Sequence, residues 1–213
     1  MKRGRMLRTL VIDTATAACS VALIEGKAII AATHDVVGRG HAERLMPMIA
    51  ALPGGGRADA ILVDCGPGSF TGVRIGLAAA RALGLGWGIG VHGYSSTAIL
   101  AAAAANRTAS PIGSSIGIAM VGGHGELFVQ RYALHPLMPL SAIESLPPHA
   151  AATALSEADI FGSGAAQLVA ARGSGIAHDQ LPRAADAVLL PEDLARLPPS
   201  PIYGRGADAK PAA

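Results

Sequence analysis

The stretch Asp64-Cys65-Gly66-Pro67-Gly68-Ser69-Phe70-Thr71-Gly72-Val73-Arg74-Ile75-Gly76 decides the fold of this chain. It follows the apolar run 60–63, which indicates a buried strand, and it leads into a helix predicted over 73–85. The segment 66–68 between them is a turn, because neither a helix nor a strand tolerates Gly-Pro-Gly in its interior. Ser69 or Thr71 can cap the helix by accepting a hydrogen bond from its first amides.

Small residues recur at every fourth position of this helix, at Gly72, Gly76, Ala80 and Gly84. A spacing of four places them on one face. Each glycine inside a helix costs about 1 kcal/mol relative to alanine. A helix that carries this cost along one stripe is expected to pack very closely against another element there.

The elements around this unit follow the order of a ribonuclease H-like lobe, the unit repeated in actin-like ATPases. A hairpin turn at 25–27 joins two of the first three strands, which form an antiparallel meander. The full order is strands 7–13, 18–25 and 28–34, helix 41–52, strand 59–64, helix 71–85, strand 89–92 and helix 98–105. The sequence therefore predicts an α/β fold with a mixed sheet flanked by helices.

The second half predicts a smaller lobe after a polar break and hinge at 106–111. Four prolines at 136, 139, 147 and 148 favour irregular structure in that stretch, and the tail after about residue 205 is expected to be disordered. The remaining elements are strands 116–121, 126–132 and 159–162, helix 165–171 and a helix within 181–197 that is interrupted near Pro191. The predicted domains are residues 1–105 and residues 106–213.

Composition points to a cytoplasmic protein without a membrane anchor. The longest alanine-rich run, 98–105, is far shorter than the roughly 20 apolar residues that span a bilayer. Asp13 interrupts the apolar stretch behind the basic N-terminus, which argues against a signal peptide. The two cysteines, Cys19 and Cys65, lie far apart in apolar strands and are predicted to be buried small hydrophobes.

Charge and histidine patterns give no metal site and little support for independent tRNA binding. The formal net charge is only +2, and basic residues are scattered without a stripe of interleaved aromatics. The seven histidines form no ligand set at helical spacing, and His41 is interpreted as a helix-start residue. No metal is therefore expected.

The glycine-rich stretch resembles the signature of the bacterial TsaB family, the tRNA threonylcarbamoyladenosine biosynthesis proteins. Supporting segments are Leu10–Thr16 with Cys19–Leu23, the helix His41–Ile49, and Pro201–Arg205, and the resemblance is dense over residues 7–100. The family motif is carried by Gly66, Pro67, Gly68, Ser69, Phe70, Thr71, Gly72 and Arg74.

The resemblance implies two ribonuclease H-like lobes, the second reduced, and an accessory subunit that catalyses nothing by itself. It implies pairing with TsaD, which carries the metal and the transfer chemistry that modifies adenosine 37 of ANN-decoding tRNAs. TsaE joins that complex, tRNA is reached only through the complex, and any nucleotide lies between subunits. The isolated chain can form a homodimer.

The partner interface is predicted on two helices. One apolar stripe of helix 41–52 suffices to cover a sheet, so its second stripe is a candidate contact surface. The alternative is that both stripes are buried within the monomer. The small-residue stripe of helix 71–85 favours a helix–helix contact. The predicted interface residues are Leu45, Met46, Ile49, Ala50, Val73, Gly76, Leu77 and Ala80, and bulky residues at Gly76 or Ala80 are expected to weaken pairing.

Two enzymatic alternatives stay open. A small ATPase or kinase would use Asp13 and Thr14 as cofactor-binding residues with the 66–72 turn, whose helix N-terminus favours anions. That turn lacks the lysine of a P-loop, and a structural role is favoured for Asp13. A peptidase, an activity proposed for the family, needs a nucleophile–base pair, and Ser115 in Gly113–Gly117 precedes a strand instead of a helix.

The second half departs from the family pattern. The family carries Asp-Ala-Arg before Gly-Glu, whereas Val121-Gly122-Gly123-His124 precede Gly125-Glu126 here. This difference puts in doubt any contact that the family makes through the acid and the arginine.

Overall fold

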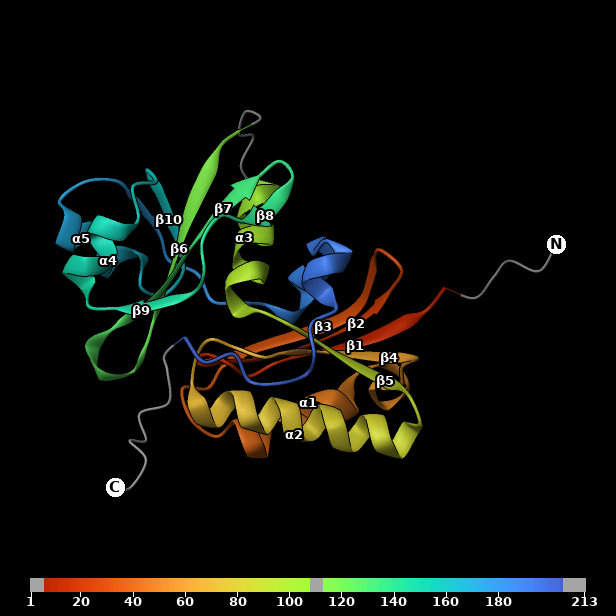
Figure 1. Ribbon diagram of the computed structural model, residues 1–213. Helices are drawn as coiled ribbons and strands as arrows, with labels where there is room; N and C mark the ends of the chain where they lie inside the picture. The colour runs from red at the N-terminus through yellow and green to blue at the C-terminus, as the bar shows by residue number, and fades with distance from the viewer. Residues whose placement is uncertain (1–5, 108–112, 205–213) are drawn as a thin grey trace, which may run out of the picture.

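The computed structural model describes residues 6–107 and 113–204, and it has five layers (Figure 1). Two helices cover the outer face of a first sheet, a third helix lies between this sheet and a second one, and two short helices cover the far side. The hinge predicted at 106–111 falls mostly, and the tail predicted after 205 entirely, outside the described residues.

The first sheet has the strand order β3-β2-β1-β4-β5. β1 pairs antiparallel with β2 and parallel with β4, so the predicted meander and mixed sheet are confirmed. Its strands are β1 (Arg8–Asp13), β2 (Ala18–Glu25), β3 (Ala28–Val36), β4 (Ala60–Asp64) and β5 (Gly90–Tyr94). The helices of this half are α1 (His41–Ala51), η1 (Pro53–Gly56), α2 (Phe70–Trp87) and α3 (Ser96–Arg107).

Successive side chains of β1 point to opposite faces of the sheet and enter two different hydrophobic cores. Leu10 and Ile12 pack with α1 and α2, whereas Val11 faces α3 together with Tyr94 and Ile99. Both cysteines are buried, as predicted. Because α3 also packs on the second sheet, nearly all of its side chains are buried.

The second sheet has the order β11-β10-β6-β7-β8, and β9 also pairs with β7. Its strands are β6 (Ser115–Val121), β7 (Leu127–Leu134), β8 (Leu137–Pro139), β9 (Glu144–Leu146), β10 (Asp159–Phe161) and β11 (Ile176–His178). The turn η2 (Gly123–Gly125) joins β6 to β7, and α4 (Pro148–Ala154) and α5 (Ala165–Arg172) cover the outer face.

The prediction of irregular structure at 136–148 is wrong for three short elements, β8, β9 and the start of α4, and two of the four prolines occupy places that tolerate them. Pro139 ends β8, an edge strand that needs no amide donor at that position. Pro148 is the first residue of α4, where a helix amide has no partner in any case.

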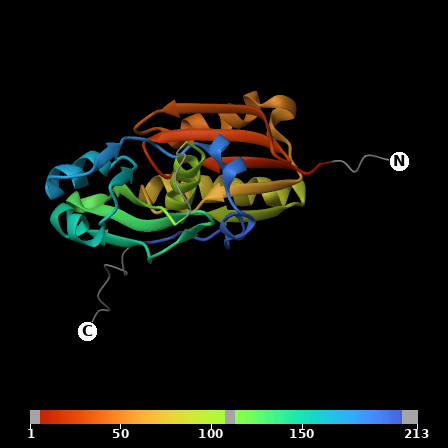
Figure 2. The same cartoon turned by 90° about the horizontal axis from the view of Figure 1, so that it is seen from above.

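The helix predicted within 181–197, with its interruption near Pro191, is confirmed in part, because the helical segments there are short and of the 3-10 type. Two short 3-10 segments stand there, η3 (Ala184–Leu189) and η4 (Glu192–Ala195), with Pro191 between them. They bring the chain back to the first sheet, where Ala184 N donates to Ser20 Oγ at 3.0 Å and Ala187 joins the core of Val11 (Figure 2). The predicted division at residue 105 stays a prediction.

Candidate functional site: the outer helices and the cleft behind them

The small-residue stripe of α2 packs closely, as its spacing indicated, but against the sheet of the same chain. A Cβ at Gly72 would overlap the carbonyl oxygen of Thr14, and one at Gly76 would lie 2.6 Å from Thr14 Oγ1. A Cβ at Gly84 would lie 2.5 Å from Val91 Cγ2. Thr14 Oγ1 also donates to the carbonyl of Gly72 at 2.7 Å. The stripe therefore seats α2 on β1 and β5.

This packing corrects most of the predicted partner interface. The core under the two helices holds six of the eight predicted residues, which are Leu45, Ile49, Val73, Gly76, Leu77 and Ala80. Only Met46, with 46% of its surface exposed, and Ala50 face solvent. The predicted helix–helix contact was wrong because a stripe of small residues suits close packing on a sheet as well as on another helix.

The solvent side of α1 and α2 is a different surface, which we call the outer face. It consists of Met46, Pro47, Ala50 and Ala51 of α1 with Ala78, Ala82 and Leu85 of α2. Leu85 is 87% exposed, and Arg81 is the exposed charged residue between Ala78 and Leu85 on α2. No element of the described chain covers these helices on the side away from the sheet (Figure 1). The helical spacing of Ala78, Ala82 and Leu85 could have identified this face.

The family-motif turn fixes how α2 starts. Gly66 adopts φ +94, a conformation that favours glycine, and its amide donates to Asp64 Oδ1 at 2.6 Å. A Cβ at Gly68 would overlap the carbonyl of Ala15. Ser69 caps the helix, as predicted, by accepting from Gly72 N at 3.2 Å. Phe70 and Arg74, in the first turns of the helix, are both exposed.

Two buried carboxyl groups lie behind this turn, at the ends of the parallel strands β1 and β4. Asp13 accepts from Tyr94 Oη at 3.0 Å, and Asp64 accepts from Ser96 Oγ at 2.8 Å. Burial raises the pKa of Asp13, and burial together with the nearby Asp13 charge raises the pKa of Asp64 well above its usual range. Because the two buried carboxyl groups interact, the state in which both are charged is unfavourable.

Asp13 and Thr14, the predicted cofactor-binding candidates, are thus used inside the protein. They are 0% and 1% exposed, and the hydroxyl of Thr14 is bonded to Gly72. Within residues 6–107 and 113–204, no group of three or more His, Cys, Asp or Glu side chains could hold a metal ion. Ser115 donates to Glu157 Oε1 at 3.3 Å, on the second sheet.

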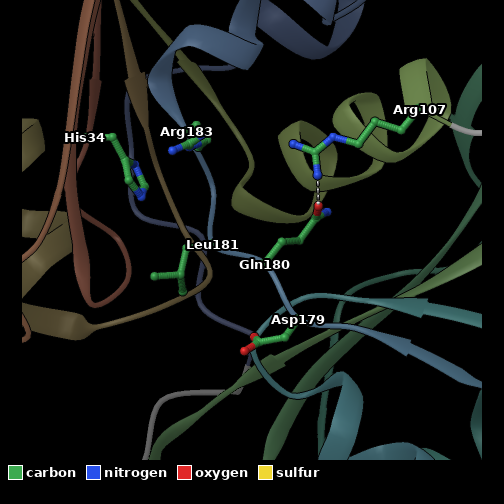
Figure 3. A pocket seen from close by; sticks show the side chains of 6 residues that line it. All are labelled: His34, Arg107, Asp179, Gln180, Leu181 and Arg183. Carbon is green, nitrogen blue, oxygen red and sulfur yellow. Dashed lines mark hydrogen bonds between the residues drawn. The ribbon is translucent and has the colours of Figure 1, made fainter.

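A hollow of about 330 Å³ opens between the two sheets, and the sequence did not single out its residues. It is lined by His34, Arg107, Asp179, Gln180, Leu181 and Arg183 (Figure 3). Arg107 Nη1 donates to Gln180 Oε1 at 3.0 Å. Burial and then the nearby Arg183 lower the pKa of His34, and burial raises the pKa of neighbouring Asp186. The lining thus holds two arginines and one carboxylate, that of Asp179.

Comparison with known proteins covers both the motif half and the whole chain. Residues 32–136 match the family described as TsaD: tRNA N6-adenosine threonylcarbamoyltransferase. An Escherichia coli protein, tRNA threonylcarbamoyladenosine biosynthesis protein TsaB, is 40% identical over 100 residues, which are 45% of this chain and 43% of that protein. An uncharacterized Mycobacterium tuberculosis protein is 40% identical over 103 residues, 45% of this chain and 49% of its own length. The chain spans about half the length of the curated relatives it matches.

Solved structures extend the similarity over nearly the whole chain. YeaZ from Pseudomonas aeruginosa superimposes with a TM-score of 0.77 at 30% identity, covering 93% of this chain and 100% of that one. A second structure, described as an uncharacterized protein with similarity to peptidase YEAZ from the same organism, gives 0.76 at 29% identity over 94% of this chain and 100% of that one. In the described part, no helix is long and apolar enough to cross a membrane. The sequence of the motif-bearing half is similar to TsaB proteins, and the complete fold is similar to YeaZ. The chain belongs to the TsaB family.

Proposed function

We propose that this chain is a non-catalytic subunit in the synthesis of threonylcarbamoyladenosine at position 37 of ANN-decoding tRNAs. The names of the Escherichia coli and Haemophilus influenzae relatives, both tRNA threonylcarbamoyladenosine biosynthesis protein TsaB, support this process. The match of residues 32–136 to the TsaD family supports a common ancestry with the expected partner.

The chain acts by pairing with TsaD through the outer face. The observation that carries this proposal is the set of exposed alanines with Met46, Pro47 and Leu85 on two adjacent helices. Small side chains let a partner helix approach closely, and exposed Met46 and Leu85 supply apolar area to bury. TsaE joins the assembly, nucleotide binds at most between subunits, and the same face supports a homodimer when TsaD is absent.

An independent ATPase is less well supported. Asp13 and Thr14 lie beside the glycine turn, as that alternative requires, but both side chains are buried and engaged in hydrogen bonds within the protein. A functional site needs groups that reach a substrate. Titration of the isolated chain with Mg-ATP tests this alternative, and tight binding would favour it.

The pairing proposal is tested with charges placed on the outer face. Ala78→Glu and Leu85→Glu should reduce the capture of TsaD at least tenfold, because each buries an unpaired carboxylate in the contact. Both positions are exposed, so stability should change by less than about 0.5 kcal/mol. In a strain lacking the chain, the same variants should fail to restore threonylcarbamoyladenosine, measured by mass spectrometry of digested tRNA.

Ala170→Glu is the matched control, since Ala170 is an exposed alanine on α5 in the other half of the molecule. It should leave capture and modification unchanged. Equal capture of TsaD by Ala78→Glu, Leu85→Glu and the unmodified chain would place the contact elsewhere.

A further inference from the structure

Two exposed aromatic side chains, far apart in sequence, meet at the start of α2. The rings of Phe70 and Tyr203 have centroids 6.0 Å apart, with the planes tilted by 36°. The guanidinium of Arg74 lies 3.2 Å from the centroid of Phe70, and its Nη2 donates to Tyr203 Oη at 3.2 Å. These three side chains form one cluster, which we call the aromatic–arginine cluster.

The exposure of this cluster is unusual for the chain. Only 3% of the residues are aromatic, and most of the others are partly or fully buried, whereas Phe70 and Tyr203 are 58% and 56% exposed. Water contact with this much aromatic surface is unfavourable. A folded protein that keeps two of its few aromatics together in solvent indicates a binding surface.

The C-terminal strap, residues 197–204, holds Tyr203 in place. Ile202 N donates to the carbonyl of Cys65 at 2.7 Å, and Arg81 Nη2 donates to the carbonyl of Pro199 at 2.6 Å. Leu197 exchanges backbone hydrogen bonds with Gly93. The strap is therefore anchored along its length, and the cluster is preorganised before any ligand arrives.

The two segments that build the cluster contain no acidic residue, and the first of them carries two arginines, Arg74 and Arg81. Residues 65–90 and 197–204 contain no Asp or Glu. In the described ranges 6–107 and 113–204, Arg74 and Arg81 have no ion-pair partner, although both make hydrogen bonds to neutral oxygens. This surface complements an anionic ligand.

From the stacking groups and the charge, we propose that the aromatic–arginine cluster binds an unpaired base and an adjacent phosphate of single-stranded RNA. This inference rests on the proposed function, in which the substrate is tRNA. Bases stack on aromatic rings and on guanidinium planes, and nearby arginines hold the phosphate. The size of the cluster suits one or two bases.

The experiment measures binding of a fluorescein-labelled single-stranded RNA heptamer to the full chain by fluorescence anisotropy, at 50 and 300 mM NaCl. The unmodified chain should prefer this RNA to a duplex of equal length. Tyr203→Ala, Phe70→Ala and Arg74→Gln should each weaken binding by about 5-fold or more, the usual effect of losing one stacking group. Arg74→Gln should also flatten the salt dependence.

Arg39→Gln and Arg196→Gln are the controls, because both residues are exposed and lie outside the cluster and the outer face. Their affinities should stay within twofold. Tyr203 follows the last helix or strand, so Tyr203→Ala tests the cluster without altering the start of α2, and circular dichroism checks the fold of Phe70→Ala. Absence of RNA binding, equal preference for duplex, or unchanged affinity in Tyr203→Ala would overturn the inference.

Capture of TsaD by the same variants separates this inference from the pairing proposal. Cluster variants should still capture TsaD, whereas Ala78→Glu should lose TsaD and keep RNA binding. Loss of TsaD capture with unchanged RNA affinity would identify the cluster as a protein contact and overturn the RNA assignment.

Discussion

Asp13 and Asp64 show how single residues can carry stability instead of catalysis. Asp64 receives hydrogen bonds from Gly66 N and Ser96 Oγ, and Asp13 receives one from Tyr94 Oη. Because two buried carboxylates repel, the fold favours the state in which one is protonated. This pair links the motif turn at 66–68 to β1 and to the start of α3.

The pair predicts a specific pH dependence. The pKa values of both carboxyls are raised in the folded protein above the value of about 3.9 in an unfolded chain. Their contribution to the free energy of unfolding is therefore complete below about pH 4 and is lost as the pH rises through the raised pKa. Asp64→Asn keeps an acceptor for Gly66 and Ser96 and supplies a permanent donor to Asp13.

Urea unfolding at pH 5 and pH 8 measures this effect. Stability of the unmodified chain should fall relative to Asp64→Asn between the two pH values, because only the unmodified pair must lose a proton. Parallel pH profiles of the two proteins would contradict a loss of a proton from this pair between pH 5 and pH 8.

At the scale of the element, α2 performs two tasks with two faces. Its inner stripe of small residues brings the helix axis close to the sheet, and its outer side presents alanines, Leu85 and two arginines. The same substitution on the two faces should therefore have opposite effects. Gly72→Ala would force a methyl group into the carbonyl of Thr14, whereas a Cβ at Gly86 meets nothing within 4 Å.

We expect Gly72→Ala to lower the free energy of unfolding by about 1–3 kcal/mol, as overpacking does, because backbone must move. Gly86→Ala should raise it by up to about 1 kcal/mol, the helix propensity difference. Chemical denaturation of both variants gives the two values. Equal effects would mean that the stripe is not closely packed.

Sequence patterns predicted the elements of the first half well, because periodicity and turn residues are local signals. The strands β1 to β5 and the helices α1 to α3 lie where the pattern placed them, within about two residues. The burial of Leu45, Leu77 and Ala80 was beyond reach, since periodicity shows that a helix has an apolar face but not what covers it. The meeting of Phe70 with Tyr203 depends on the path of the strap, which no local pattern encodes.

At the scale of the whole molecule, two features join the sheets into one structure. α3 contributes Ala98, Leu100 and Ala101 to the core of the second sheet, and Ile99 to the core of the first. The segment after β11 leaves the second sheet and returns to the first, where Ala184, Ala187 and the strap pack. The two halves on either side of the predicted boundary at residue 105 therefore pack against each other.

This arrangement predicts that the chain unfolds as one cooperative unit. Opening either sheet exposes one side of α3, and removing the returning segment uncovers Cys65 and the face of Val11, so neither half keeps its core alone. Differential scanning calorimetry should show a single transition with equal calorimetric and van't Hoff enthalpies. Two resolved transitions would instead establish residues 1–105 and 106–213 as independent domains, each with a core sufficient for its own fold.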